Sequence, residues 1–186
     1  MNNNFKNFQT KRLEIFREVV KKEAQDKLTK QNLDQLAAEI KEKYNYPEDT
    51  LPFIKDHIRL ALGLSPTERD YFSNEIKEAL DLDHVESPVV EKIQGVCQYC
   101  DQEIEESDCY QSCKYEAHIY NRNEGPVIAQ DKCLSCGSCI GDCSLGALAD
   151  KIEFIPLTKL LNDQDSKVYA AVAPSIVGQF GSDVSM

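Results

Sequence analysis

The chain has 186 residues, of which 41% are hydrophobic and 28% charged, and its formal net charge is −11. This length allows one domain or two small ones, and the acidity disfavours nucleic acid and anionic lipid as partners. The sequence has no run of about 18 apolar residues, so no membrane span is predicted. Because Met1–Lys6 lacks the apolar stretch of a secretory signal, we expect a cytoplasmic protein with reduced thiols.

Residues 1–95 contain no cysteine and predict a helical region. Apolar residues recur at roughly helical spacing over 5–20, and a cleaner stripe of the i, i+3, i+4, i+7 type runs over 33–44. After a break at Tyr46–Asp49, Thr50 is positioned to cap a third helix with Pro52 in its first turn, and Gly63 is a stop signal.

A fourth helix is predicted to begin at Ser65-Pro66-Thr67-Glu68, which fits the capping box. Phe72, Ile76 and Leu80 follow at intervals of four residues. Core packing accounts for the aromatic residues of this region without any cofactor.

The next region, residues 96–150, is loop-rich and contains all eight cysteines, from Cys97 to Cys143. Short strands are predicted at Pro126–Ala129 and at Lys151–Ile155. Residues 156–166 are interpreted as a linker with some helix. The apolar run Val168–Ala173 predicts a buried strand that Pro174 ends.

The strongest motif is Cys133-Leu-Ser-Cys136-Gly-Ser-Cys139-Ile-Gly-Asp-Cys143, with the spacing C-x2-C-x2-C-x3-C. Three cysteines two residues apart let a tight loop wrap a [4Fe–4S] cluster, and the fourth follows on a turn of helix. In ferredoxins with two clusters this fourth cysteine ligates the other cluster. Small residues between the ligands allow backbone N–H groups to approach the sulfurs.

A second set of four cysteines precedes this run. It is looser, with Cys97-Gln-Tyr-Cys100 and Cys109-Tyr-Gln-Ser-Cys113 separated by the acidic and polar stretch Asp101–Asp108. Each set contributes three cysteines to one cluster and its fourth cysteine to the other cluster, which predicts a pseudo-twofold arrangement of the two sets. We assign Cys97, Cys100, Cys109 and Cys143 to one [4Fe–4S] cluster, and Cys133, Cys136, Cys139 and Cys113 to the other.

Zinc is the alternative, since structural zinc also takes four thiolates, often from two C-x2-C pairs. The first set suits zinc better than the tight Cys133–Cys143 run does. Disulfides are a third possibility. Histidines are not counted among the ligands: His57, His84 and His118 are interpreted as packed or surface residues. Four tyrosines are expected to shield a cluster from water, namely Tyr99, Tyr110, Tyr115 and Tyr120.

The segment Cys133–Leu148 resembles the bacterial-type [4Fe–4S] ferredoxin domain. The resemblance covers about a third of the chain if Cys97–Asp150 is included. The proline that usually follows the fourth cysteine is replaced by Ser144 in one set and Lys114 in the other. This departure removes no ligand.

A second resemblance lies at the end of the chain. The sequence Val168-Tyr-Ala-Ala-Val-Ala-Pro-Ser-Ile-Val-Gly-Gln-Phe-Gly181 is similar to the opening strand and helix of the catalytic domain of [FeFe]-hydrogenases. In that family the segment follows a two-cluster ferredoxin domain, and Ile58–Leu64 is similar to the leader of some members. The resemblance implies an electron relay to a downstream hydrogenase domain. It carries over no catalytic residue, because the family's active-site cysteines lie beyond this segment.

Together these observations predict an α+β protein in three parts: a helical region 1–95, a ferredoxin-type domain 96–150, and a linker with an incomplete hydrogenase-like start 151–186. The expected function is one-electron transfer through two [4Fe–4S] clusters, with a redox protein partner that the acidic stretch Asp101–Asp108 helps to dock. A cluster-dependent regulatory protein and a zinc-stabilised interaction module remain alternatives. No motif indicates an enzyme acting alone, and the sequence does not predict an oligomeric state.

Overall fold

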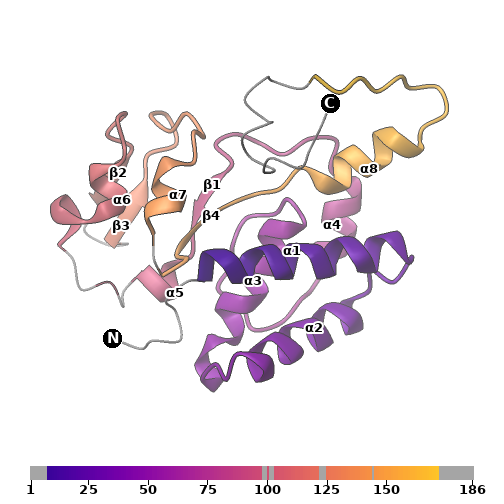
Figure 1. Ribbon diagram of the computed structural model, residues 1–186, viewed down its shortest axis with the longest axis horizontal. Helices are drawn as coiled ribbons and strands as arrows, with labels where there is room; N and C mark the ends of the chain where they lie inside the picture. Colours follow the sequence, from indigo (N-terminus) through magenta and orange to yellow (C-terminus); the bar gives the residue numbers. More distant parts are fainter. Residues whose placement is uncertain (1–7, 98–99, 101–102, 122–124, 144, 172–186) are drawn as a thin grey trace, which may run out of the picture. The chain divides into compact units, whose positions relative to one another are not determined.

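The structure is a computed structural model, and it mixes helices with two small antiparallel sheets, in agreement with the α+β prediction (Figure 1). The predicted ferredoxin-type domain stays a prediction. None of the described helices is both long and apolar enough to cross a membrane. The residues that the structure describes are 8–97, 100, 103–121, 125–143 and 145–171.

The chain divides into two compact units, Met1–Pro156 and Leu157–Met186. The predicted boundary at residue 95 lies inside the first unit, so the helical region and the cysteine region belong to one compact body. The described part of the second unit contains the end of a helix and then a stretch without regular secondary structure up to residue 171.

The described residues from 8 to 93 contain four α-helices. Those predicted over 5–20 and 33–44 are present, as is the one after Thr50, although residues 5–7 lie outside the described part. The helix Leu51–Ala61 has proline in its first turn, and Gly63, just past its C-cap Leu62, has a left-handed φ of 85°. The helices are α1 (Phe8–Ala24), α2 (Lys30–Lys43), α3 (Leu51–Ala61) and α4 (Glu75–Asp81), with a 3-10 turn η1 (Glu48–Thr50) before α3.

The capping box predicted at Ser65–Glu68 is wrong, because α4 begins only at Glu75. The backbone N–H groups of Thr67 and Glu68 donate instead to the buried carboxylate of Asp56, at 2.9 and 3.0 Å. Glu68 also has a φ of 59°, which no right-handed helix allows. A tertiary partner on α3 therefore takes the donors that a local cap would have satisfied.

The cysteine region contains short elements. Its helices are α5 (Gln94–Cys97), η2 (Ile104–Glu106), α6 (Asp108–Gln111) and α7 (Ser138–Asp142), and α8 (Phe154–Asn162) follows. The strands pair as β1 (Val90–Lys92) with β4 (Leu148–Asp150) and as β2 (His118–Asn121) with β3 (Gly125–Ile128). The register places Lys92 opposite Leu148 and His118 opposite Ile128.

Two strand predictions have different outcomes in this region. The strand predicted at Pro126–Ala129 is confirmed as β3. The strand predicted at Lys151–Ile155 is wrong, because the strand ends at Asp150 and α8 starts at Phe154. Ile152 donates its N–H to the carbonyl of Leu60, at the end of α3, rather than to a strand.

The buried strand predicted at Val168–Ala173 is also wrong for its described part. Val168 and Tyr169 have no strand structure, and their exposed fractions are 46% and 85%. A strand needs a pairing edge, and none is present for these residues in the described chain. The remainder of the hydrogenase-like segment, from residue 172, lies outside the described residues.

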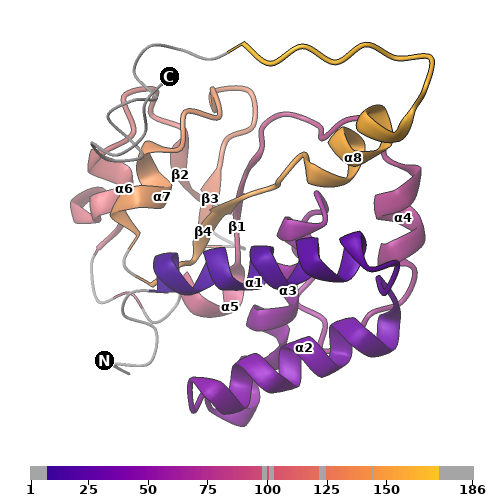
Figure 2. The same cartoon turned by 45° about the vertical axis from the view of Figure 1, so that its right-hand side comes forward.

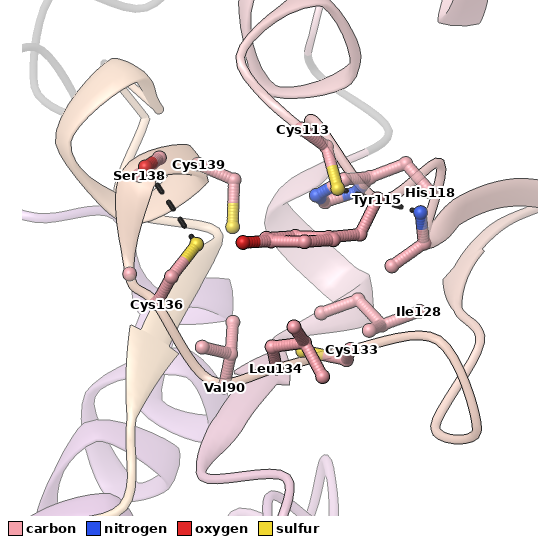
Figure 3. A pocket seen from close by; sticks show the side chains of 12 residues that line it. Val90, Cys113, Tyr115, His118, Ile128, Cys133, Leu134, Cys136, Ser138 and Cys139 are labelled. Carbon is pink, nitrogen blue, oxygen red and sulfur yellow. Dashed lines mark hydrogen bonds between the residues drawn. The ribbon is translucent and has the colours of Figure 1, made fainter.

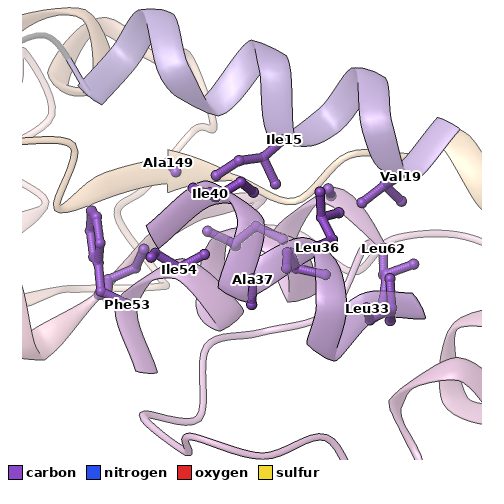
Figure 4. Close-up of a cluster of buried hydrophobic side chains, with 14 of the residues drawn as sticks. Ile15, Val19, Leu33, Leu36, Ala37, Ile40, Phe53, Ile54, Leu62 and Ala149 are labelled. Atoms are coloured by element: carbon purple, nitrogen blue, oxygen red, sulfur yellow. The ribbon is translucent and has the colours of Figure 1, made fainter. Parts of the chain in front are cut away.

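One hydrophobic core joins the helices to the cysteine region. Ile15 and Val19 on α1 face Ile40 on α2 and Ile54 on α3, and Ala149 on β4 lies in the same core (Figure 4). The partly buried Cys97, Cys100 and Cys143 pack against this core. In the turned view α1 runs across α3 towards the strands (Figure 2). The helices thus pack against part of the cysteine region and support it.

Candidate metal centre

The eight cysteines are divided between two cavities, and none of the eight forms a disulfide. What we call the first cavity is lined by Cys113, Cys133, Cys136 and Cys139 (Figure 3). The second cavity is lined by Cys97, Cys100, Cys109 and Cys143. These groups are the same two sets of four that the sequence pattern predicts as ligand sets. The ligand assignment itself stays a prediction.

Two short helices distribute cysteines to both cavities. Cys139 lies on α7 and is buried against the first cavity, whereas Cys143 caps α7 and lines the second. At Cys143 the backbone becomes extended, with φ −79° and ψ 93°, so its side chain leaves the helical direction. Cys109 on α6 and Cys113 just after it are divided between the cavities in the opposite sense. In each C-x3-C pair, therefore, the fourth cysteine of the motif lies at the other cavity from the cysteine four residues before it.

The loop before α7 holds Cys133 and Cys136 at the rim of the first cavity. Ser135 and Gly137 both adopt left-handed backbone, with φ of 55° and 76°. The Ser135 hydroxyl accepts the N–H of Val89 at 3.0 Å, which ties the loop to the start of β1. This hydrogen bond anchors the C-x2-C loop to the residue that precedes β1.

Several hydrogen bonds end on the cysteine sulfurs. Ala117 donates its N–H to Cys113 Sγ at 3.4 Å, and Ser107 Oγ lies 3.4 Å from Cys109 Sγ. The Ser138 backbone and hydroxyl lower the pKa of the exposed Cys136. Such contacts stabilise a thiolate, which is the form that ligates a metal.

Burial acts in the opposite direction on other thiols. It raises the pKa of Cys139 to about 12 and also raises the pKa of Cys97 and Cys143. Three backbone N–H groups, from Leu145, Ala147 and Leu148, oppose this rise at Cys143. A metal centre that bound here would therefore release protons from these thiols.

His118 on β2 lines both cavities, which the sequence analysis did not anticipate. Its side chain is buried, and burial together with the positive charge of Lys92 lowers its pKa. His84 is exposed, and His57 is buried and lines neither cavity, so the interpretation as packed or surface residues holds for those two. For His118 it was incomplete, because strand pairing brings this residue between the cysteine sets.

Lys92 on β1 is the second missed residue, and it lines the second cavity. Val90, two residues earlier, lines the first cavity. Side chains at i and i+2 of a strand share a face, so both point to the cysteine side of β1. The alternation along β1 predicts an apolar residue at position 92. The lysine there is the sequence signal that could have indicated a role at the cavity.

Tyr115 extends across the first cavity with its hydroxyl towards Cys136 and Cys139 (Figure 3). Tyr110 is half-buried but does not line either cavity. The side chains of Tyr99 and Tyr120 lie outside the described residues. Tyr115 is therefore placed beside the cysteines of the first cavity, and the shielding of a cluster by tyrosines stays a prediction.

Across the described ranges, no three Cys, His, Asp or Glu side chains converge on a point where a single ion would be held. The sulfurs stand around two hollows instead. No protein-family model matches the chain, and neither a curated protein nor a solved structure matches it.

Proposed function

We propose that this chain is an electron-transfer protein or module that binds two [4Fe–4S] clusters. The observation that carries the proposal is the division of the eight cysteines into two sets of four, each around its own cavity. Four thiols per cavity are the donor set that a [4Fe–4S] cluster requires. Cys97, Cys100, Cys109 and Cys143 would hold one cluster, and Cys113, Cys133, Cys136 and Cys139 the other.

A cluster bound in each cavity would supply a one-electron site between a low-potential donor protein and an acceptor protein. The chain's own residues orient the sulfurs through α6 and α7 and donate hydrogen bonds to them. Tyr115 and Leu134 cover part of the first cavity against water. The resemblance to the input segment of [FeFe]-hydrogenases supports an electron-relay role, with a hydrogenase domain or a separate redox protein as acceptor.

Metal content gives the first test of this proposal. We expect about eight iron atoms and about eight acid-labile sulfides per chain after anaerobic purification, because two clusters contribute four of each. About four of each would contradict the second cluster. Zinc without sulfide would replace the proposal with a zinc-stabilised interaction module.

The exchange of the fourth cysteine is tested by two matched variants. Cys143→Ser is expected to change the spectrum of the cluster held by Cys97, Cys100 and Cys109, and Cys113→Ser that of the cluster held by the Cys133 run. Electron paramagnetic resonance of the reduced protein distinguishes the two signals. If Cys143→Ser instead altered the signal that Cys136→Ala removes, the ligand pairing would be wrong.

A regulatory role is the second candidate, and the shared core favours it. Cys97, Cys100 and Cys143 pack against the same core as α1, α2 and α3, and His57 on α3 donates a hydrogen bond to the carbonyl of Gly146 at 3.1 Å. Loss of the cluster held by Cys97, Cys100, Cys109 and Cys143 would therefore destabilise the packing of these helices. Hydrogen exchange with and without clusters separates the candidates: faster exchange throughout α1–α3 supports a sensor, and changes confined to 97–143 support a relay.

A further inference from the structure

The two cavities differ in charge, and the difference lies at Lys92. Among the described residues that line either cavity, Lys92 carries the one ammonium or guanidinium group. Its Nζ atom is buried, and it lies in the wall that also contains Cys97 and His118. The first cavity has Val90, Ile128 and Leu134 in its walls instead.

Two carboxylates oppose Lys92 at the second cavity. Asp108 and Asp142 belong to its lining, but both residues are exposed. Water and salt screen exposed charges much more strongly than a buried one. The positive charge of Lys92 is therefore the least screened charge at this cavity.

We propose that the charge of Lys92 raises the reduction potential of the cluster held in the second cavity. Its effect on the potential of the cluster in the first cavity is much smaller. This inference rests on the proposed function. Reduction adds one negative charge to a site, and a nearby positive charge stabilises the reduced form more than the oxidised form. The effect falls with distance, and the buried His118 stands between the cavities.

Three variants test the role of this charge. Lys92→Met removes the charge and keeps the length of the side chain, and Lys92→Arg keeps the charge. Lys114→Met is the matched control, because Lys114 is exposed but lies within electrostatic reach of Cys136 at the first cavity. Iron and sulfide are measured first on each variant. Potentials are then obtained by redox titration with dithionite and mediators, followed by electron paramagnetic resonance.

In Lys92→Met we expect the ratio of reduced to oxidised second-cavity cluster, at the wild-type midpoint, to fall about tenfold, which is about 59 mV for one electron. Lys92→Arg should titrate as the wild type does, and Lys114→Met should shift neither potential by a comparable amount. The shift in Lys92→Met should persist at high salt, because a buried charge is poorly screened.

Assignment to a cavity uses chains with one cluster. In a Cys136→Ala background the remaining signal belongs to the second cavity, and Lys92→Met should lower its potential. In a Cys100→Ala background the remaining signal belongs to the first cavity, and the same substitution should leave it nearly unchanged. If Lys92→Met does not retain its iron, Lys92→Gln takes its place in the same comparison.

Failure of this inference differs from failure of the proposed function. A wild-type protein without iron and sulfide refutes the proposed function. If Lys92→Met holds two clusters whose potentials are unchanged, the role of Lys92 is refuted and the proposed function stands. Equal shifts in Lys92→Met and Lys92→Arg also refute it, because packing and not charge would then be the cause.

Discussion

Replacing Arg59 with methionine is expected to destabilise the protein by about 3–5 kcal/mol, because two buried carboxylates would lose their counter-ion. The Arg59 side chain is fully buried, with Asp56 and Glu75 buried beside it. Its guanidinium donates to Asp56 Oδ1 at 2.8 Å and, through Nε and Nη2, to Glu75 Oε1 at 3.1 and 3.0 Å.

The remaining donors of Arg59 bind backbone carbonyls. Nη1 donates to Arg69 O at 3.1 Å, and Nη2 donates to Tyr71 O at 2.6 Å. Together with the carboxylate bonds, these satisfy all five N–H groups of the guanidinium. Arg59 thus connects α3 to the loop that leads into α4, and no methionine contact replaces these bonds.

Urea unfolding, followed by the helical circular dichroism signal under anaerobic conditions, measures the change. Lys43→Met is the control: Lys43 pairs with Glu14 at 2.9 Å, but both side chains are exposed, so we expect a loss below about 1 kcal/mol. Arg59→Lys should fall between the two, because it keeps the charge but not the fork of donors. Equal stability of Arg59→Met and Lys43→Met would contradict the structural role of this ion network.

Local signals in the sequence located three of the helices. The apolar stripe over 33–44, and the proline and glycine at the ends of α3, depend on neighbours only a few residues away. The Ser65–Glu68 capping box failed for the opposite reason. Its backbone donors are taken by Asp56, whose place beside Arg59 depends on packing that no local pattern records.

The division of the cysteines could be predicted because ligand spacing is a local property. Cys139 on α7 and Cys143 at its C-cap are four residues apart, and the end of the helix between them places them in different cavities. His118 and Lys92 could not be placed in the same way. Lys92 reaches its cavity through β1, whose partner β4 lies far along the chain, with Lys92 paired to Leu148. His118 lies in the β2–β3 hairpin, and only tertiary packing brings that hairpin to the cysteines. Register over such separations is set by the assembled core.

The second large effect is a pH dependence that originates at His57. This histidine is buried on α3, its ring meets Phe53 edge-on at 4.7 Å, and its Nε2 donates to Gly146 O at 3.1 Å. Burial lowers the pKa of His57 to about 3. The folded protein therefore keeps this imidazole neutral across the whole neutral range, whereas the unfolded chain takes up a proton near its ordinary pKa of about 6.5.

The sign follows from that difference. A depressed histidine pKa contributes its full stability above about pH 6.5, and the contribution is lost as the pH falls and the unfolded state gains the proton. Between pH 7.5 and 5.5 the free energy of unfolding should fall by about 1.4 kcal/mol from this residue alone. The window avoids the strong acid that releases sulfide from iron–sulfur clusters.

The comparison of His57→Gln with the wild type isolates this contribution, because glutamine retains an N–H donor for the carbonyl of Gly146. His118 also has a lowered pKa, but it is present in both proteins and cancels in the difference. We expect the pH slope of His57→Gln to be smaller by about 1.4 kcal/mol over the window, and His84→Gln, at an exposed site, to keep the wild-type slope. Parallel curves for His57→Gln and the wild type would mean that His57 takes up its proton within the folded state. The tie between α3 and the turn after Cys143 would then not depend on a neutral imidazole.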